Sequence, residues 1–271
     1  MEEASTGGAG TLPPSAILVA DCQIRGATTT RLALFDLGRT LVRGDPAMMF
    51  ARYLREHGRF PDASWERLDA AVRAYHGGGD PDLAVDGANE AFASGFAGMS
   101  PARLEALARE KVLAGGDADY YAYTRPLLAA VGALGYRKVG VTGVADPLAS
   151  VIGSALGLDE MYATALGVDA DGRLTGRTLF ENRVGWKLER VRRLLAQAGP
   201  DLDACLAFGD SGADLPLLLA VGRPVIVNAR EPLLSEVAAL GWPMFGEADD
   251  IAARLPALLA APAWNARARE P

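Results

Sequence analysis

The side chains that could do chemistry in this chain follow short apolar runs. Asp36 comes directly after Leu32–Phe35, and Asp210 and Asp214 follow the run Cys205–Phe208. Asp36 and Asp210 suit one shared divalent cation, because Mg²⁺ takes a few carboxylate and carbonyl oxygens and leaves its other positions to water and substrate phosphate. These residue types indicate chemistry on a small phosphorylated molecule.

Lys187 and Thr142, which is followed by Gly143, complete such a site. Lys187 and the cation would neutralise a phosphoryl group, and the Thr142 hydroxyl would donate a hydrogen bond to the same oxygens. Asp36 is then free to attack phosphorus and form an aspartyl phosphate. Each residue alone also fits a turn, a helix cap or an exposed helix position. Their order and strand-end placement together favour the catalytic interpretation.

These residues require a fold that brings strand ends together. Strands and helices alternate after about residue 119, which is typical of a parallel sheet covered by helices on both faces. Ligands bind such open α/β sheets at the carboxyl ends of the strands. Strands are predicted at Arg31–Phe35, Val139–Val141, Met161–Leu166, Ala204–Phe208 and Pro224–Val227, helices at Pro46–Glu56, Pro126–Leu134, Pro147–Leu156 and Trp186–Ala198, and a hairpin turn at Asp171-Gly172.

The predicted fold class is thus α/β, with a helical segment inserted after the first strand. The block from Asp62 to Leu113 reads as helix after helix without a strand, so we expect residues 45–118 to form a helical cap. The core then comprises residues 31–44 and 119–271. Residues 1–30 are predicted to be an N-terminal extension, partly disordered because its first half is rich in Gly, Ser, Thr and Pro.

Composition limits the classes of partner. The chain has 271 residues, half of them apolar, and a net charge of −7 without a basic run. This charge argues against nucleic acid and against an anionic membrane surface. The two cysteines are far apart and in no metal-ligand spacing, and we find no signal peptide or membrane span, so we expect a cytoplasmic protein. The oligomeric state stays open.

Four ordered segments resemble the motifs of the haloacid dehalogenase superfamily, and within it the phosphoserine-phosphatase-like branch. They are Phe35–Leu41, Val141–Gly143, Gly185–Lys187 and Phe208–Leu217, and the segments Gly222–Asn228 and Gly241–Pro243 are similar to the region after the last motif in that branch. The resemblance runs from about residue 31 to residue 250. It implies a Rossmann-like core, a helical cap over the site, and Mg²⁺-dependent phosphoryl transfer to the first-motif aspartate.

The resemblance also implies a role for each matching residue. Asp36 is the nucleophile and a metal ligand, and Gly38 offers its backbone carbonyl to the metal. Thr142 and Lys187 hold the phosphate. The metal site is completed by Asp210, with Asp214 behind it, whereas Ser211 beside them receives no role.

The chain departs from the family pattern at Gly38. A second aspartate usually stands there, as general acid for the leaving group and general base for the hydrolytic water. General acid–base help is worth about 10²–10⁴-fold, so hydrolysis of alkyl phosphates should be slow unless another group substitutes. Arg39 could bind a substrate anion or face solvent. Asp45 could face the substrate and donate a proton, or cap the helix that begins at Pro46.

Three functions remain open from the sequence. The first is a phosphatase for a small phosphorylated metabolite. The second is a non-hydrolytic enzyme that uses the same site on a phosphorylated substrate. The third is a catalytically impaired relative that binds a ligand or a protein partner. The substrate itself is not indicated, because cap residues would select it and this cap offers only ordinary amphipathic helices.

Overall fold

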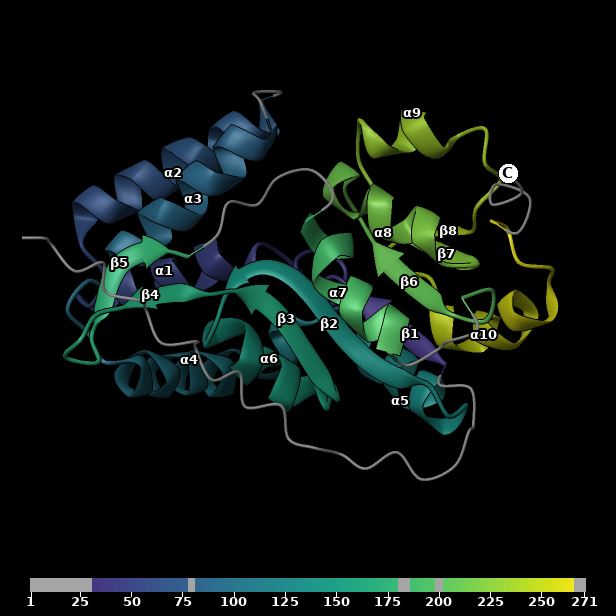
Figure 1. Cartoon of the computed structure of the whole chain (residues 1–271), viewed down its shortest axis with the longest axis horizontal. Coiled ribbons are helices and arrows are strands. Elements are labelled where there is room, and N and C mark those ends of the chain that lie inside the picture. The colour runs from purple at the N-terminus through teal and green to yellow at the C-terminus, as the bar shows by residue number, and fades with distance from the viewer. Residues whose placement is uncertain (1–30, 78–80, 180–185, 198–201, 266–271) are drawn as a thin grey trace, which may run out of the picture.

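A computed structural model describes residues 31–77, 81–179, 186–197 and 202–265 of the chain. A central sheet has helices on both sides, and a group of helices lies at one end of it (Figure 1). The N-terminal extension predicted over residues 1–30 lies outside the described residues.

Six parallel strands form the sheet, in the order β3-β2-β1-β6-β7-β8. The strands are β1 (Leu32–Phe35), β2 (Arg137–Ala145), β3 (Glu160–Thr164), β6 (Leu206–Gly209), β7 (Arg223–Val227) and β8 (Met244–Phe245). Phe35 at the end of β1 pairs with Gly140 on one side and with Phe208 on the other. The strand order reverses at β1, and such a switch point opens a crevice at the carboxyl ends of the strands. The predicted α/β class and parallel sheet are confirmed.

The central strand β1 is apolar throughout because both faces of the sheet are covered there. All four residues of β1 are fully buried. Leu32 and Leu34 face one hydrophobic cluster, whereas Ala33 and Phe35 face the other. The Phe35 ring stacks on Phe208 of the neighbouring strand with centroids 4.7 Å apart, which fixes the end of β1 against β6.

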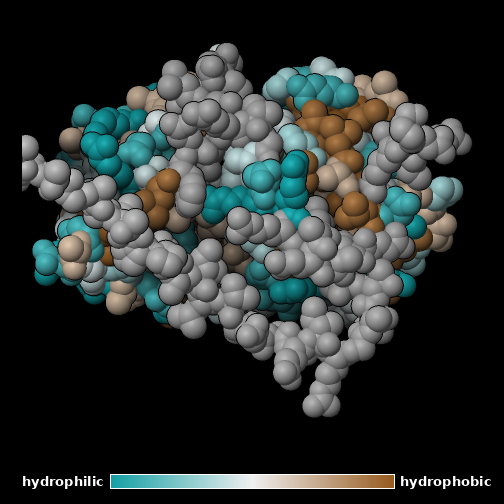
Figure 2. All heavy atoms as spheres, in the orientation of Figure 1, coloured by the Kyte–Doolittle hydropathy of each residue, from teal (hydrophilic) through white to brown (hydrophobic). Residues whose placement is uncertain are grey.

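Helices supply the rest of both clusters. The helices α5 (Thr124–Ala133), α6 (Leu148–Leu156) and α10 (Ile251–Ala260) contribute to the cluster around Phe35, and α7 (Trp186–Gln197), α8 (Leu215–Ala220) and α9 (Leu233–Val237) to the cluster around Leu34. Figure 2 shows apolar surface over α8 and α9, where Leu219 and Leu234 are partly exposed. No helix among the described residues is both long enough and apolar enough to cross a membrane.

The segment between β1 and α5 is helical, as predicted. It contains α1 (Pro46–Glu56), α2 (Asp62–His76), α3 (Pro81–Ser94), α4 (Pro101–Gly115) and the 3₁₀ helix η1 (Gly116–Asp119). Asp45 caps α1, because its Oδ1 accepts a hydrogen bond of 2.8 Å from the Met48 backbone N–H. Among its described residues this segment forms no strand, and Phe50, Phe92 and Phe96 pack together in its interior. The division into core and cap domains stays a prediction.

A hairpin of β4 (Leu166–Val168) and β5 (Leu174–Thr178) stands outside the main sheet. Gly172 has a φ of +75° in its turn, in agreement with the turn predicted at Asp171-Gly172. The hairpin joins the inserted helices: Glu90 of α3 accepts hydrogen bonds from the Thr178 backbone N–H (2.9 Å) and hydroxyl (2.6 Å). Part of the predicted core segment 119–271 therefore packs on the helical insertion.

The second strand is longer than the sequence predicts. The prediction ends it at Val141, but β2 continues to Ala145, with a register shift between Val141 and Ala145 where it pairs with β3. The extension arises because Ala145 resumes pairing with Thr164 beyond the irregularity. Thr142 therefore lies within the strand, next to the irregular stretch, and not in a loop after it.

Candidate active site

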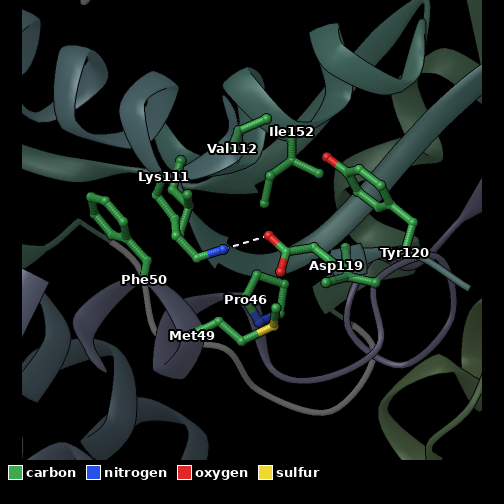
Figure 3. A pocket seen from close by; sticks show the side chains of 10 residues that line it. Pro46, Met49, Phe50, Lys111, Val112, Asp119, Tyr120 and Ile152 are labelled. Carbon is green, nitrogen blue, oxygen red and sulfur yellow. Dashed lines mark hydrogen bonds and ion pairs between the residues drawn. The ribbon is translucent and has the colours of Figure 1, made fainter. Parts of the chain in front are cut away.

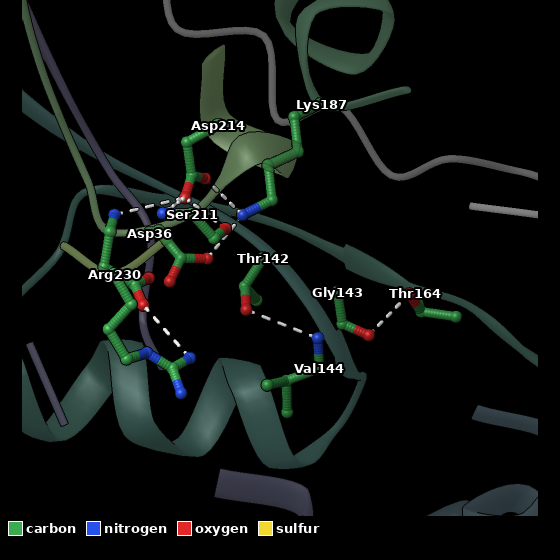
Figure 4. Close-up of polar contacts among 10 residues, drawn as sticks. Asp36, Thr142, Gly143, Val144, Thr164, Lys187, Ser211, Asp214 and Arg230 are labelled. Carbon is green, nitrogen blue, oxygen red and sulfur yellow. Dashed lines mark hydrogen bonds and ion pairs between the residues drawn. The ribbon is translucent and has the colours of Figure 1, made fainter. Parts of the chain in front are cut away.

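Asp36 stands at the switch point of the sheet, directly after β1. Its backbone N–H donates a hydrogen bond of 3.1 Å to the Phe208 carbonyl of β6, so the sheet ladder fixes its position. The residue is only 6% exposed. Figure 4 shows the Asp36 carboxylate turned toward Lys187, with Thr142 on the same side. The predicted nucleophile thus lies at the carboxyl end of β1, between β2 and β6.

Lys187 joins two carboxylates from the first turn of α7. Its Nζ lies 2.6 Å from Asp36 Oδ1 and 2.5 Å from Asp214 Oδ1, and all three side chains are buried. Although burial acts to lower it, the Asp214 and Asp36 charges raise the pKa of Lys187 above its ordinary value. Lys187 therefore carries a fixed positive charge against the nucleophile.

Asp214 supports the site from behind. Its Oδ2 accepts hydrogen bonds from the Asp210 N–H (3.2 Å), the Ser211 N–H (3.1 Å) and the Ser211 hydroxyl (2.8 Å). The bond from the Ser211 N–H is one half of a capping box on the 3₁₀ helix η2 (Gly212–Asp214), and in the other half the Ser211 side chain accepts from the Asp214 backbone N–H. Since Oδ1 already holds Lys187, both oxygens of Asp214 have protein donors. The structure thus places Asp214 as a support for Lys187 and the Asp210 loop, and its role as a metal ligand stays a prediction.

Three carboxylates crowd the site. One oxygen each of Asp36, Asp210 and Asp214 lies within 4.8 Å of the others. Burial raises the pKa of Asp36 to about 7, although Lys187 opposes this effect. Burial and the charges of Asp36 and Asp214 also hold the pKa of Asp210 well above its ordinary range. A pocket of hard, mutually repelling oxygen ligands fits a divalent cation such as Mg²⁺, with Asp36 and Asp210 as its side-chain ligands.

Thr142 and Gly143 border this group on β2. The Thr142 Oγ1 accepts a hydrogen bond of 3.3 Å from the Val144 N–H, which leaves its own proton for an outside acceptor. The Gly143 carbonyl accepts a hydrogen bond of 2.8 Å from the Thr164 hydroxyl, which holds the irregular part of β2 (Figure 4). Figure 4 thus places Thr142 near Asp36 and Lys187, and its role in phosphate binding stays a prediction.

Gly38 lies in a closely packed turn. An added Cβ would stand 3.3 Å from Pro46 Cδ and 3.5 Å from the Gly44 carbonyl oxygen. The adjacent Arg39 N–H donates to the Val42 carbonyl at 2.7 Å, which closes the turn. The start of α1 therefore crowds the position at which the family pattern places an acid.

A clamp that the sequence does not reveal holds this turn from the β7 side. Arg39 has a φ of +59° and Asn228 a φ of +50°, a left-handed region that costs non-glycine residues energy. Asn228 Nδ2 donates to the Arg39 carbonyl (2.9 Å) and to the Tyr123 hydroxyl (2.8 Å). The Tyr123 hydroxyl in turn donates to the Thr40 carbonyl at 2.6 Å. The only sequence signal for this clamp is the position of Asn228 after a predicted strand.

Two arginines lie near the carboxylates, whereas the predicted site residue Asp45 caps a helix. The positive charge of Arg39 acts to lower the pKa of Asp210, so the Arg39 side chain lies on the site side of the turn. Arg230, which the sequence reasoning did not select, has its Nη2 4.0 Å from Asp210 Oδ2. Asp45 uses an oxygen to cap α1, which is the structural one of its two predicted roles. A substrate role for Arg39 or Asp45 stays a prediction.

Tyr75 near the end of α2 also escaped the sequence reasoning. Burial, together with the charges of Asp210 and Asp214, raises the pKa of Tyr75 above its ordinary value. An aromatic residue on an amphipathic helix carries no sequence signal for such an effect, because it depends on tertiary packing.

A separate pocket lies where α1 and α4 meet α6 (Figure 3). Pro46, Met49 and Ile152 supply apolar walls, and an ion pair of Lys111 with Asp119 crosses it. None of the residues predicted for the site lines this pocket, so the chemistry at the strand ends is separate from it.

Known proteins resemble this chain in sequence and fold. A family model described as haloacid dehalogenase-like hydrolase matches residues 33–219. A phosphoserine phosphatase of Mycobacterium tuberculosis is 31% identical over 219 residues, covering 79% of this chain and 70% of that protein. A Bordetella pertussis protein of unknown function has a TM-score of 0.69 and 30% identity over 81% of this chain and 100% of its own. A phospho-aspartyl intermediate analogue of phosphoserine phosphatase shares the fold, with a TM-score of 0.60 and 21% identity over 85% of this chain and 99% of its own.

Proposed function

Because this chain belongs to the haloacid dehalogenase-like hydrolase family, we propose that it is a Mg²⁺-dependent phosphatase of a small phosphorylated metabolite. The observation that carries this proposal is the position of Lys187, which bridges Asp36 and Asp214 beside Asp210. The similarity to a mycobacterial phosphoserine phosphatase supports a phosphomonoester as the substrate class.

In the proposed reaction, Asp36 is the nucleophile. Its carboxylate attacks phosphorus to form an aspartyl phosphate, which water then hydrolyses. Lys187 and the Thr142 hydroxyl hold the phosphoryl oxygens. Asp36, Asp210 and the Gly38 carbonyl would hold Mg²⁺, which when bound neutralises the negative charge of the phosphoryl group.

The helices inserted after β1 are proposed to act as the cap of this site. They lie between Asp36 and α5 in the chain, and the charges of Asp210 and Asp214 add to burial in raising the pKa of Tyr75 on α2. A substrate would then sit between the strand ends and these helices, with its leaving group toward the helices. The cap would select the substrate, and Arg39 or Arg230 at the rim would attract its negative charge.

The lack of an acid at Gly38 supports two alternatives to the phosphatase. With no acid at this position, the protein could bind phosphorylated ligands or a partner without turnover, or carry out a non-hydrolytic reaction on them. The intact arrangement of Asp36, Lys187 and Asp210 favours the phosphatase, since a site kept only for binding has no need of a buried nucleophile against a lysine.

A phosphoenzyme assay tests the proposal. We expect Mg²⁺-dependent turnover of p-nitrophenyl phosphate, whose leaving group needs little protonation. We also expect an acid-stable, hydroxylamine-labile phosphoenzyme during turnover. Asp36→Asn should abolish both signals, whereas Asp45→Asn, which keeps the cap of α1, should retain the phosphoenzyme. Tight phosphate binding without phosphoenzyme or turnover would instead support the binding protein.

A further inference from the structure

The carboxylates of the site differ in their cationic partners. Lys187 donates hydrogen bonds to Asp36 (2.6 Å) and to Asp214 (2.5 Å). The buried Asp210 carboxylate instead forms an ion pair with Arg230, whose Nη2 lies 4.0 Å from Asp210 Oδ2. In Figure 4, Lys187 reaches Asp36 from one side, and a dashed line on the other side joins the Arg230 guanidinium to the Asp210 carboxylate. Arg230 therefore acts as a counter-ion of Asp210.

The loop after β7 brings Arg230 to this place. Asn228, two residues earlier, belongs to the clamp on the turn after β1. The next residue, Glu231, accepts hydrogen bonds from the Ser235 backbone N–H (3.2 Å) and hydroxyl (2.6 Å), so this acid is engaged by α9. The backbone on both sides of Arg230 is thus anchored, and its side chain extends from this loop to Asp210.

The two cations of the site are held with different firmness. Lys187 is buried and makes two short hydrogen bonds. The 4.0 Å between Arg230 and Asp210 is longer than a hydrogen bond, and 44% of the Arg230 side chain is exposed. Arg230 can therefore leave Asp210 for solvent without breaking a hydrogen bond to this carboxylate, whereas Lys187 is fixed.

Asp210 is also a proposed ligand of Mg²⁺, so two positive groups are offered the same carboxylate. Like charges that share one carboxylate repel each other. A metal at Asp210 therefore weakens the attraction of Arg230 to this residue. By the reciprocity of linked equilibria, Arg230 weakens metal binding by the same factor.

We propose that Arg230 is an exchangeable counter-ion of Asp210, which balances this carboxylate in the metal-free protein and leaves it when Mg²⁺ binds; this inference rests on the proposed metal site. The consequence is a site that binds a divalent cation more weakly than its carboxylates alone would allow.

Titration with Mn²⁺ tests this exchange. Mn²⁺ takes oxygen ligands as Mg²⁺ does, and the electron paramagnetic resonance signal of the free ion reports how much is bound. In low-salt buffer at pH 8, which limits the screening of exposed charges, we expect Arg230→Gln to bind Mn²⁺ about 3–10-fold more tightly than the unmodified protein. Arg230→Lys, which keeps the charge, should bind it with nearly the unmodified affinity.

Arg137→Gln is the matched control. Arg137 is an arginine of similar exposure (42%) that is ion-paired with Glu160. It is the first residue of β2 and so lies at the edge of the sheet opposite the carboxyl ends of the strands. Its loss removes the same charge from the protein, and we expect the Mn²⁺ affinity to stay unchanged.

Melting temperatures give a second readout that does not depend on activity. Without metal, Arg230→Gln should melt at a lower temperature than the unmodified protein, because Asp210 loses its counter-ion. Excess Mg²⁺ should remove this difference, since the metal then balances Asp210 in both proteins. For Arg137→Gln, any difference from the unmodified protein should be the same in both buffers.

The outcomes separate this inference from the proposed function. An unchanged or weaker Mn²⁺ affinity of Arg230→Gln overturns the exchange, while Mn²⁺ binding by the unmodified protein still supports the metal site. Tighter binding in both Arg230→Gln and Arg230→Lys would mean that the bulk of the guanidinium and not its charge matters, which also overturns it. If the unmodified protein binds no Mn²⁺, or Asp210→Asn binds it equally well, the proposed metal site fails and this inference falls with it.

Discussion

At the residue scale, Gly38 leaves the site without its proton-transfer group, whereas the candidate binding groups are all present. The groups that would hold a phosphoryl oxygen and a metal are assembled around Asp36, whereas position 38 has neither an acid nor open space for one. A Cβ added at this position would stand closer to Pro46 Cδ than usual van der Waals contact. A larger residue must therefore displace the start of α1 by a few tenths of an ångström. The departure from the family pattern is thus built into the packing of the turn.

Gly38→Asp tests whether the missing acid limits turnover. We expect it to raise kcat/KM for an alkyl phosphate such as glycerol 2-phosphate by about tenfold or more, because a carboxyl group can protonate the leaving oxygen. Gly38→Ala adds the same Cβ contact without the acid and should give no gain, while both variants lose about 1–3 kcal/mol of unfolding free energy through overpacking. A gain in neither variant would show that another step is limiting.

At the element scale, the hairpin β4–β5 ties the inserted helices to the part of the chain after β3. Glu90 of α3 accepts two hydrogen bonds from Thr178, and the Gly98 and Met99 backbones bond to Leu174. The insertion is therefore held at both of its chain connections and at this third place. For the inserted helices to close over the site, either the hairpin must move together with them or these hydrogen bonds must break.

Substitutions at two glycines of the hairpin test how tightly it packs on the inserted helices. Gly172 and Gly176 both have φ near +75°, but only Gly176 faces the insertion, where an added Cβ would lie 2.9 Å from Ala97 Cβ. We expect Gly172→Ala to cost about 1–2 kcal/mol for the left-handed backbone alone. Gly176→Ala should cost about 1–3 kcal/mol more, because Ala97 must also shift. Urea unfolding gives both values, and equal costs would show that the hairpin packs loosely.

At the scale of the whole molecule, the buried charges of the site lower the free energy of unfolding. A folded protein with three buried carboxylates and one buried lysine keeps an excess of negative charge at its sheet switch point. The raised pKa of Asp36, about 7, means that the folded state binds a proton here more tightly than the unfolded chain does. Stability from this group is therefore full below about pH 4 and is lost as the pH rises toward 7.

Asp36→Asn should remove the energetic cost of ionising a buried carboxylate at this position. In metal-free buffer at pH 8 we expect it to raise the free energy of unfolding by about 1–4 kcal/mol, and near pH 4 to change it little. Excess Mg²⁺ should raise the melting temperature of the unmodified protein more than that of the variant, because binding to the folded state stabilises it. Asp45→Asn, the same substitution outside the carboxylate cluster and one that keeps the cap of α1, is the matched control. A destabilised Asp36→Asn at pH 8 would mean that the Lys187 ion pair outweighs burial.

The sequence by itself determined the elements and the identities of the groups that meet. Local signals suffice for them: Asp45 and Pro46 begin α1 at the predicted residue, the apolar run before Asp36 is β1, and Asp171-Gly172 makes a turn. Placing Asp36, Lys187 and Asp210 together needed only the rule that parallel strands align their carboxyl ends. Their order along the chain carried the family resemblance.

The tertiary structure alone decided what surrounds these groups. The Asn228 clamp, the bond of Lys187 to Asp214 and the crowding of Gly38 by Pro46 all join segments far apart in the chain or depend on the shape of a turn. No local pattern encodes such contacts, because they depend on which faces pack after the sheet order is set. The candidate nucleophile can thus be predicted from the sequence, whereas the groups that pack around it are known only from the tertiary structure.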